Sequence, residues 1–491
     1  MAMKKLTILL IACLGLTSGC KKFLDVEPKG KAIPTDYAHF NGLLNNPYLG
    51  GLQHLKFTAT SNAETGEISY SFSILGDVEA PFYMADDVQA NPATFNNFSR
   101  VQQNFYKWAD DVYLPEDNAP EWGAFYSQNY VYNLVIQGTM ESRGGTDREK
   151  NMLVAEARAV RAYLHFYAAQ LFAAPYQEAT AATDLGIPLV LEANTEAKGF
   201  TRSSNQELYS FIVNELEESI PLLNEQTINR SRLSQLGGYY MLGQVYFQMQ
   251  KYDLALKAFQ QANGLVAKSQ IAIHLYDYNV MVNQWYFPFM ANMGLVNFPD
   301  VYTNEENIFV KQTAVPITSA FATKMLLRPE VYALFKSNDE RKKIYSNKGL
   351  FSSASLPGFQ RAGPGTFNLA ASMSNLLLMK AECEARAGNL AAAQADLLML
   401  RKNRMPLSDA QQSFSTKEEL VKAILDERLR EFAATGIRWL DMRRLANDSQ
   451  FNNLHTTRSI DGSTYTLKKE RLTLRIPAGI LAHNPSMQNN P

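Results

Sequence analysis

Apolar residues recur at helical spacing along much of this 491-residue chain. Between residues 149 and 173 they fall three or four positions apart, which places them on one face of an amphipathic helix. The residues on that face are Leu153, Ala157, Val160, Leu164, Tyr167 and Leu171. Ser204 and Asn205 can cap the start of a second helix, which we expect from about residue 206 to 223.

Residues 239–262 have the spacing of a tetratricopeptide repeat. The repeat has a bulky residue, Leu, Gly, Tyr, Ala, Phe and Ala at fixed positions. In this sequence those positions hold Tyr239, Leu242, Gly243, Tyr246, Ala255, Phe259 and Ala262. Gly243 would let two antiparallel helices approach closely, and Phe259 would fill the groove beside it. A degenerate second copy spans residues 377–400. Because such pairs cannot bury their faces alone, we expect them to stack with the helices described above.

The remaining sequence has weak periodicity and is rich in aromatic residues, Asn, Pro and Gly. A long irregular insertion between scaffold elements is more often functional than idle. We therefore predict a mainly α fold, in which tetratricopeptide-like pairs form a superhelical scaffold and a loop-rich lobe binds ligand. The scaffold would comprise about 122–265 and 372–450, and the variable lobe about 49–121 and 270–370. Together they would form a single domain, 49–491.

The first residues have the pattern of an export signal. Two lysines precede a short apolar run that ends at Leu16, and about eleven apolar residues are too few to span a bilayer. Small residues then precede Cys20, as in lipoprotein signals. We predict a signal peptide at 1–19 and a lipid anchor on Cys20. Residues 20–48 would form a tether and docking segment.

Charge and cysteine content narrow the class of protein. The 47 basic and 48 acidic residues nearly balance, which argues against nucleic-acid binding. The chain has three cysteines: Cys13 leaves with the signal, Cys20 carries lipid, and Cys383 stands alone on a helical pattern. No disulfide is therefore expected, and stability must come from a large core.

Catalytic motifs are absent from the sequence. It contains no HExxH, GxSxG, GxxxxGK[ST] or CxxC motif. His165 lies on the long helix, where a core role is favoured over metal binding. Asp86-Asp87 and Asp110-Asp111 are adjacent pairs whose side chains point apart, so we interpret them as solvated faces or caps rather than a converging acid and base. A calcium site built on Asp86 or Asp87 with loop carbonyls stays open, and no other cofactor is expected.

The Arg-rich run 426–444 permits two interpretations. It could bind phosphate, but acidic and basic residues are interleaved along it. We therefore predict that Arg438, Arg443 and Arg444 pair with carboxylates across a helical corner, with Gly436 ending the preceding helix.

Two clusters combine flat aromatic rings with polar residues, the mixture that suits sugars. A sugar ring stacks its C–H face on an aromatic side chain, while Asn, Asp and Arg bond its hydroxyl groups. The candidate ligand-binding residues are Trp285, Tyr286, Asn283, Phe82, Tyr83 and Asp86. Any single aromatic residue here is more often part of the core than a sugar platform, and Trp285 is the leading platform candidate because it lies in irregular sequence beside Asn283 and Gln284. We expect Trp285→Ala to weaken ligand binding and to leave thermal unfolding nearly unchanged, whereas a large loss of stability with unchanged affinity would place Trp285 in the core.

Taken in their order along the chain, from Cys20 to the C-terminus, these sequence features resemble those of the SusD/RagB family of outer-membrane nutrient-binding lipoproteins. The residues that carry the resemblance are 20–25, 85–87, Trp122 with Tyr126, Tyr130 and Asn133, 155–163, 186–189, 239–262, 380–382 with Gly388, 427–443, 484–485 and 488–491.

The resemblance implies a cell-surface lipoprotein of the outer membrane that captures a nutrient without catalysis. It implies a SusC-type TonB-dependent transporter as partner, docked on the N-terminal segment and the repeat face, and a ligand site near 70–110 and 280–330. Oligosaccharides are the leading ligand class, and peptides are the first alternative. A surface glycosidase, which would need two carboxylates about 5–9 Å apart in a cleft, and a purely structural adaptor are further alternatives.

Overall fold

The computed structural model describes residues 34–45, 54–61, 68–75, 79–117, 119–285, 298–311, 313–314, 323–349, 355–363 and 367–491. The predicted signal peptide, the lipid anchor Cys20 and the ligand candidate Tyr286 lie outside the described residues, as does most of the predicted tether.

Helices make up most of the described chain. The α-helices are α2 (Tyr37–Leu43), α3 (Ala80–Met84), α4 (Arg100–Tyr106), α5 (Pro120–Gly138), α6 (Asp147–Phe172), α7 (Asn205–Ser219), α8 (Gln235–Gln248), α9 (Tyr252–Leu265), α10 (Tyr278–Trp285), α12 (Pro329–Tyr332), α13 (Met373–Arg386), α14 (Leu390–Arg401), α15 (Leu407–Ala410), α16 (Lys417–Glu431), α17 (Arg438–Leu445) and α18 (Ala478–His483). Short 3-10 helices include η3 (Ile220–Leu222) and η6 (Glu340–Ile344).

The described strands form antiparallel two-stranded sheets. The pairs are β1 (His54–Ser61) with β2 (Ile68–Leu75), β3 (Val88–Ala90) with β6 (Met325–Leu327), β4 (Asn307–Phe309) with β10 (Ala371–Ser372), β5 (Thr313–Ala314) with β9 (Phe367–Asn368), β7 (Tyr345–Lys348) with β8 (Ser355–Arg361), and β11 (Thr457–Ile460) with β12 (Ser463–Thr466). The β3–β6, β4–β10 and β5–β9 pairs join segments far apart in sequence, and β3–β6 ties the two halves of the lobe together.

The predicted helix pairs are confirmed. Helices α8 and α9 pack closely because Gly243 faces the ring of Phe259, where a Cβ atom would overlap the ring. Helices α13 and α14 form the second pair, and Gly388 in their turn has φ of +88°, a conformation that favours glycine. Helix α6 packs between α5 and α7. Ser204 caps α7 by a reciprocal capping box with Glu207, as its position before the apolar run predicts.

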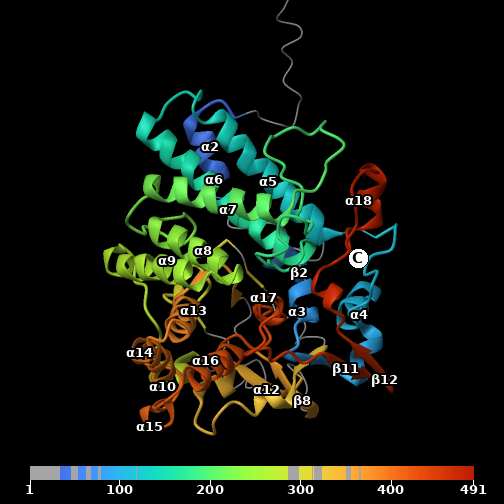
Figure 1. The fold of residues 1–491 in the computed structure, drawn as a ribbon, viewed down its shortest axis with the longest axis vertical. Coiled ribbons are helices and arrows are strands. Elements are labelled where there is room, and N and C mark those ends of the chain that lie inside the picture. Colours follow the sequence, from blue (N-terminus) through green and yellow to red (C-terminus); the bar gives the residue numbers. More distant parts are fainter. Residues whose placement is uncertain are drawn as a thin grey trace, which may run out of the picture.

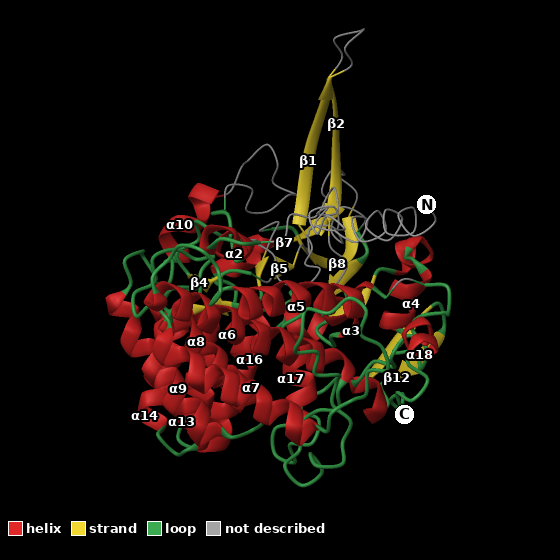
Figure 2. Ribbon diagram, turned by 90° about the horizontal axis from the view of Figure 1, so that it is seen from above, coloured by secondary structure: helices red, strands yellow, loops and turns green. Residues whose placement is uncertain are grey.

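The elements divide into a helical stack and a strand-bearing region. Figure 1 shows α6, α7, α8 and α9 stacked above α13, α14 and α16, with α3, α4 and α18 to the other side. Figure 2 shows β4, β5, β7 and β8 along one face of this stack, where the β1–β2 hairpin projects. The mainly α fold predicted from periodicity is thus confirmed, and the strand-bearing region lies along one face of the helical stack.

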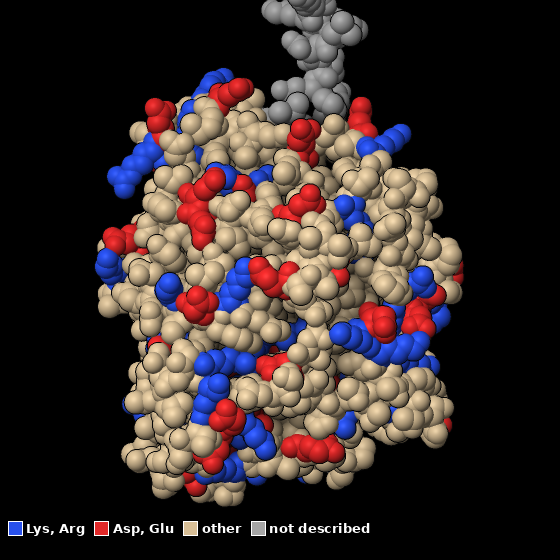
Figure 3. Space-filling model, viewed as in Figure 1, with Lys and Arg blue, Asp and Glu red and all other residues tan. Residues whose placement is uncertain are grey.

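Surface charge is mixed rather than segregated. On the face shown in Figure 3, acidic and basic side chains lie interspersed among uncharged residues. Asp110 pairs with Lys468 at 2.8 Å and Asp111 pairs with Arg475 at 2.9 Å, both at exposed positions. The near balance of charges in the sequence is therefore also a local balance on this face.

Candidate functional site

Trp285 and its neighbours form an aromatic cluster at the end of α10. The Trp285 ring is 5 % exposed, and its centroid lies 5.3 Å from that of Tyr276, 5.4 Å from Tyr278 and 4.7 Å from Phe298. These edge-to-face contacts make the ring part of the aromatic core, which contradicts the expectation that its removal would spare stability. Ligand contact by Trp285 itself stays a prediction.

Asn283, on the same helix, has an exposed side chain. Its Oδ1 accepts a hydrogen bond of 2.9 Å from Lys343 Nζ. The amide is therefore placed at the surface, beside the buried ring of Trp285 rather than on an open aromatic platform.

The second predicted cluster lies on α3, which packs against α4 and α17. Phe82 is half-buried and meets the buried Tyr83 ring edge-on at 5.4 Å. Asp86 is fully buried, and its Oδ1 accepts a hydrogen bond of 2.6 Å from Arg438 Nε. The interpretation of Asp86 as part of a solvated face or a cap is therefore wrong, because Asp86 is buried and is paired with Arg438, a cation far away in the sequence.

The pKa values of the adjacent aspartates move in opposite directions. Burial opposes ionisation of Asp86, but Arg438 holds the pKa of Asp86 below its ordinary value. Burial raises the pKa of Asp87 to about 6, although the Ala434 N–H, which donates to Asp87 at 2.7 Å, favours its ionised form. Both Asp86 oxygens accept hydrogen bonds, from Arg438 Nε and Nη2 and from the His455 N–H at 2.7 Å.

Metal binding finds no support elsewhere in the described residues. No group of three or more His, Cys, Asp or Glu side chains converges there as a ligand set. His165 is buried with Nδ1 2.9 Å from the Arg161 carbonyl oxygen, and burial lowers its pKa to about 4. The predicted core role of His165 is confirmed.

The Arg-rich run forms the predicted corner, with one exception. Arg438 pairs with Asp86, and Arg444 pairs with Glu382 at 2.6 Å. Arg443 instead donates to backbone carbonyls, among them that of Ala173 at 2.7 Å. The prediction of a carboxylate partner for Arg443 was wrong because the end of α6 presents carbonyl oxygens there that lack helical partners.

Concave sites of three kinds occur in the described part of the chain. A groove of about 520 Å³ lies on the scaffold among residues that include Arg148, Leu222 and Gln235, and it has no aromatic lining. An apolar pocket of about 200 Å³ lies between α5 and α18, where Trp122 and Tyr126 face it and Asn484 is its polar residue. Neither combines aromatic rings with several hydrogen-bonding groups, as a sugar site requires.

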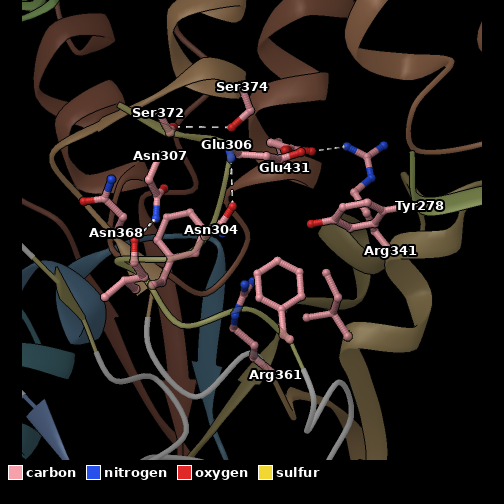
Figure 4. Close-up of a pocket in the computed structure, with 14 residues that line it drawn as sticks. Tyr278, Asn304, Glu306, Asn307, Arg341, Arg361, Asn368, Ser372, Ser374 and Glu431 are labelled. Carbon is pink, nitrogen blue, oxygen red and sulfur yellow. Dashed lines mark hydrogen bonds and ion pairs between the residues drawn. The ribbon is translucent and has the colours of Figure 1, made fainter. Parts of the chain in front are cut away.

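The third concave site has that combination and lies on the seam between scaffold and lobe. It is lined by Tyr278, Phe298, Val301, Asn304, Glu306, Asn307, Arg341, Ile344, Arg361, Phe367, Asn368, Ser372, Ser374 and Glu431. These come from α10, the 298–306 segment, β4, η6, β8, β9, β10, α13 and α16 (Figure 4). We name it the seam cavity. Its volume is about 40 Å³, whereas a pocket for a whole small-molecule ligand is typically ~300–1,000 Å³.

Acidic residues of the seam cavity belong to a buried ion network. Arg404 Nη2 donates to Glu306 and Glu431, each at 2.8 Å, and Arg341 pairs with Glu431 at 2.8 Å. Burial raises the pKa of Glu306. Burial also acts on Glu431, but Arg404 and Arg341 outweigh it and lower the Glu431 pKa. Both carboxylates are therefore bridged by one guanidinium.

Two asparagine amides are placed by local turns. Asn304 Oδ1 accepts the Glu306 N–H at 2.9 Å, and Asn307 Nδ2 donates to the Val301 carbonyl at 2.8 Å. The other halves of these amides make no hydrogen bond within the described part of the chain. The seam cavity therefore offers an amide donor and an amide acceptor beside the rings of Phe298 and Phe367.

None of the five predicted ligand-binding residues that the structure describes lines the seam cavity, and Tyr286 lies outside the described residues. Trp285 lies behind two of its rings, Tyr278 and Phe298. The irregular 270–370 segment supplies most of the lining, as its lack of periodicity indicates. Asn304, Asn307 and Arg361 were missed individually, because no local pattern distinguishes them from other polar residues of that segment.

Comparisons with known proteins agree over nearly the whole chain. The sequence matches the SusD family over residues 365–491 and a second family, described as starch-binding and associating with the outer membrane, over residues 22–247. No curated protein matches the chain.

Solved structures share the fold. A SusD superfamily protein from Bacteroides thetaiotaomicron is 20 % identical with a TM-score of 0.66, over 93 % of this chain and 100 % of that chain. A SusD-like carbohydrate-binding protein from Bacteroides vulgatus is 16 % identical with a TM-score of 0.64, over 92 % and 97 % of the two chains. At these identities the likeness establishes the arrangement of elements.

Proposed function

The chain belongs to the SusD/RagB family, and from this premise we propose that it captures an oligosaccharide at the outer-membrane surface and passes it to a SusC-type TonB-dependent transporter. The observation that carries the proposal is the pair of family matches together with the shared fold. Most of the residues that line the seam cavity, from Tyr278 to Arg361, lie between the two matched segments.

Catalysis forms no part of this proposal, because members of this family are binding proteins. Glu306 and Glu431 are the carboxylates that line the seam cavity, and their pKa values shift apart as those of a hydrolytic pair would. Arg404 bonds to both, however, so neither is free to protonate a glycosidic oxygen or to attack a sugar carbon. We interpret them as supports of the cavity wall.

Attachment to the membrane would rest on the lipid anchor proposed at Cys20. Within the described residues, no helix has the length and hydropathy needed to cross a bilayer. Metabolic labelling with a palmitate analogue tests the anchor: wild-type protein should take up label, and Cys20→Ala should take up none and leave the membrane fraction. Label retained by Cys20→Ala would contradict the proposal.

Ligand capture is tested by titrating the Cys20→Ala protein with neutral and acidic plant, host and microbial oligosaccharides, with short peptides as a parallel set. Saturable binding of one glycan class supports the proposal. Saturable binding of peptides alone would assign the chain to the alternative ligand class and contradict glycan capture. Copurification of a TonB-dependent transporter with wild-type protein from outer membranes tests delivery.

A further inference from the structure

Arg361 is a buried arginine of the seam cavity that has no acidic partner in the described part of the chain. Its side chain is 5 % exposed, and Nη1 donates to the Ala433 carbonyl at 3.1 Å. Nη1 also donates to the Tyr345 hydroxyl at 3.4 Å, and Nε is buried without a hydrogen-bond partner in the described part of the chain. Figure 4 shows the guanidinium pointing up toward Asn304, with aromatic rings beside it.

The neighbouring ion network does not compensate this charge. Its ion pairs link four acids to four arginines, so its formal charges cancel: Asp339, Glu306, Glu427 and Glu431 with Arg341, Arg401, Arg404 and Arg430. Arg361 adds one positive charge outside these pairs. Asp87 accepts the Ala434 N–H at 2.7 Å and forms no ion pair with Arg361 in the described part of the chain.

An uncompensated buried cation is costly unless something pairs with it. Arginine presents a fork of N–H donors that matches a carboxylate, and such charge-assisted pairs are among the strongest hydrogen bonds. We propose that Arg361 selects acidic oligosaccharides by receiving the carboxylate of a uronic-acid residue in the seam cavity. This inference rests on the proposed function and names the substrate class for it.

Cavity size and lining agree with a carboxylate rather than a whole ring. A cavity needs ~10–15 Å³ to hold one water molecule. The seam cavity, with a volume of about 40 Å³, therefore holds a carboxylate-sized group and leaves the sugar ring at its mouth. Phe298 and Phe367 are half-buried and could meet such a ring, while Asn304 and Asn307 could bond its hydroxyls. A peptide terminus would also bring a carboxylate, but the aromatic and amide lining favours a sugar.

The test compares an acidic ligand with its uncharged methyl ester. Trigalacturonic acid and its fully methyl-esterified form are titrated calorimetrically into the Cys20→Ala protein, with trialanine as the peptide probe. The same titrations are run on Arg361→Gln and Arg361→Lys, and on Arg328→Gln as an arginine variant of the lobe away from the cavity. Thermal unfolding of each variant separates lost binding from lost folding.

We expect the acid to bind at least tenfold more tightly than its ester. Arg361→Gln should weaken acid binding about 10- to 100-fold, the range for a hydrogen bond to a charged group, with the ester little affected. Arg361→Lys should lose less affinity for the acid, because lysine keeps the positive charge but lacks the forked donors of arginine. Arg328→Gln should bind the acid as tightly as the parent does. If Arg361→Gln does not fold, the acid–ester comparison on the parent and Arg361→Lys still decides.

Equal affinity for acid and ester, or unchanged acid binding in Arg361→Gln, would overturn this inference and leave glycan capture intact. Binding of neutral glycans without binding of trigalacturonic acid would do the same. Binding of trialanine with no binding of any glycan would overturn both the inference and the proposed function.

Discussion

Buried arginines meet contrasting environments in this protein. At the C-terminal corner, Arg438 and Arg444 are buried and each meets a carboxylate, Asp86 at 2.6 Å and Glu382 at 2.6 Å. In the seam cavity, Arg361 is as deeply buried but bonds to a carbonyl and stacks near aromatic rings. The two environments differ in charge compensation rather than in burial.

That difference separates residues that hold the fold together from one that is available to ligand. The Asp86–Arg438 pair joins segments 352 positions apart, so it fixes the early lobe onto the C-terminal helices. Arg361 joins no segments by an ion pair in the described chain. Breaking the first kind of contact should cost stability, whereas removing the second should cost affinity.

The largest expected effect comes from Arg438→Met. It leaves the buried Asp86 carboxylate without its cation, which typically costs about 3–5 kcal/mol of unfolding free energy. Urea unfolding followed by circular dichroism measures this cost. The double variant Asp86→Asn with Arg438→Met should recover part of it, and no recovery would show that the two residues are not coupled.

Trp285→Ala should follow, with a loss of about 3 kcal/mol or more. The buried ring contacts Tyr276, Tyr278 and Phe298, and its removal leaves a cavity in the aromatic core. Urea unfolding measures the loss, and a glycan titration of the folded variant measures any change in affinity. An unfolding free energy equal to that of the parent, with weaker binding, would instead support the platform role predicted from sequence.

Glu121 is a buried acid that forms no ion pair within the described part of the chain, so its ionisation should make the free energy of unfolding depend on pH. Burial raises the pKa of Glu121 to about 7, while the Tyr113 hydroxyl donates to it and favours ionisation. Because the folded pKa exceeds the unfolded one, stability present at low pH is lost as pH rises through about 7. We expect a loss of about 2 kcal/mol between pH 5 and 8.

Glu121→Gln supplies the control for this pH effect. The uncharged amide cannot titrate, so the variant should lose most of that decline in unfolding free energy over the same pH range. The same dependence of unfolding free energy on pH in the parent and in Glu121→Gln would contradict the raised pKa of Glu121.

The smallest effect is expected from Gly243→Ala, at about 1 kcal/mol. The added Cβ would overlap the Phe259 ring, and the cost of overpacking exceeds the gain in helix propensity. Gly264→Ala in the partner helix is the matched control, because no atom lies within 4 Å of its Cβ position, and it should stabilise slightly. Thermal unfolding ranks the three proteins, and equal transitions would contradict close approach of α8 and α9.

Much of the scaffold could be predicted because its signals are local. Gly243 and Phe259 lie within one helix pair, and Ser204 lies three residues from its capping partner Glu207. Apolar spacing predicted where helices form, and the resemblance to a family indicated how they stack. The lobe could be predicted only as a region, since its strands pair across long sequence separations.

The helices, their pairing and the balance of charge follow from local sequence patterns, because helical periodicity and capping act over a few residues. Which charged residues are compensated depends on the folded arrangement of distant segments. Asp86 is neutralised by a residue 352 positions away, and Arg361 is left unpaired beside a complete ion network. Ion pairing depends on distance in space and on burial, and neither quantity is encoded in the spacing of neighbouring residues.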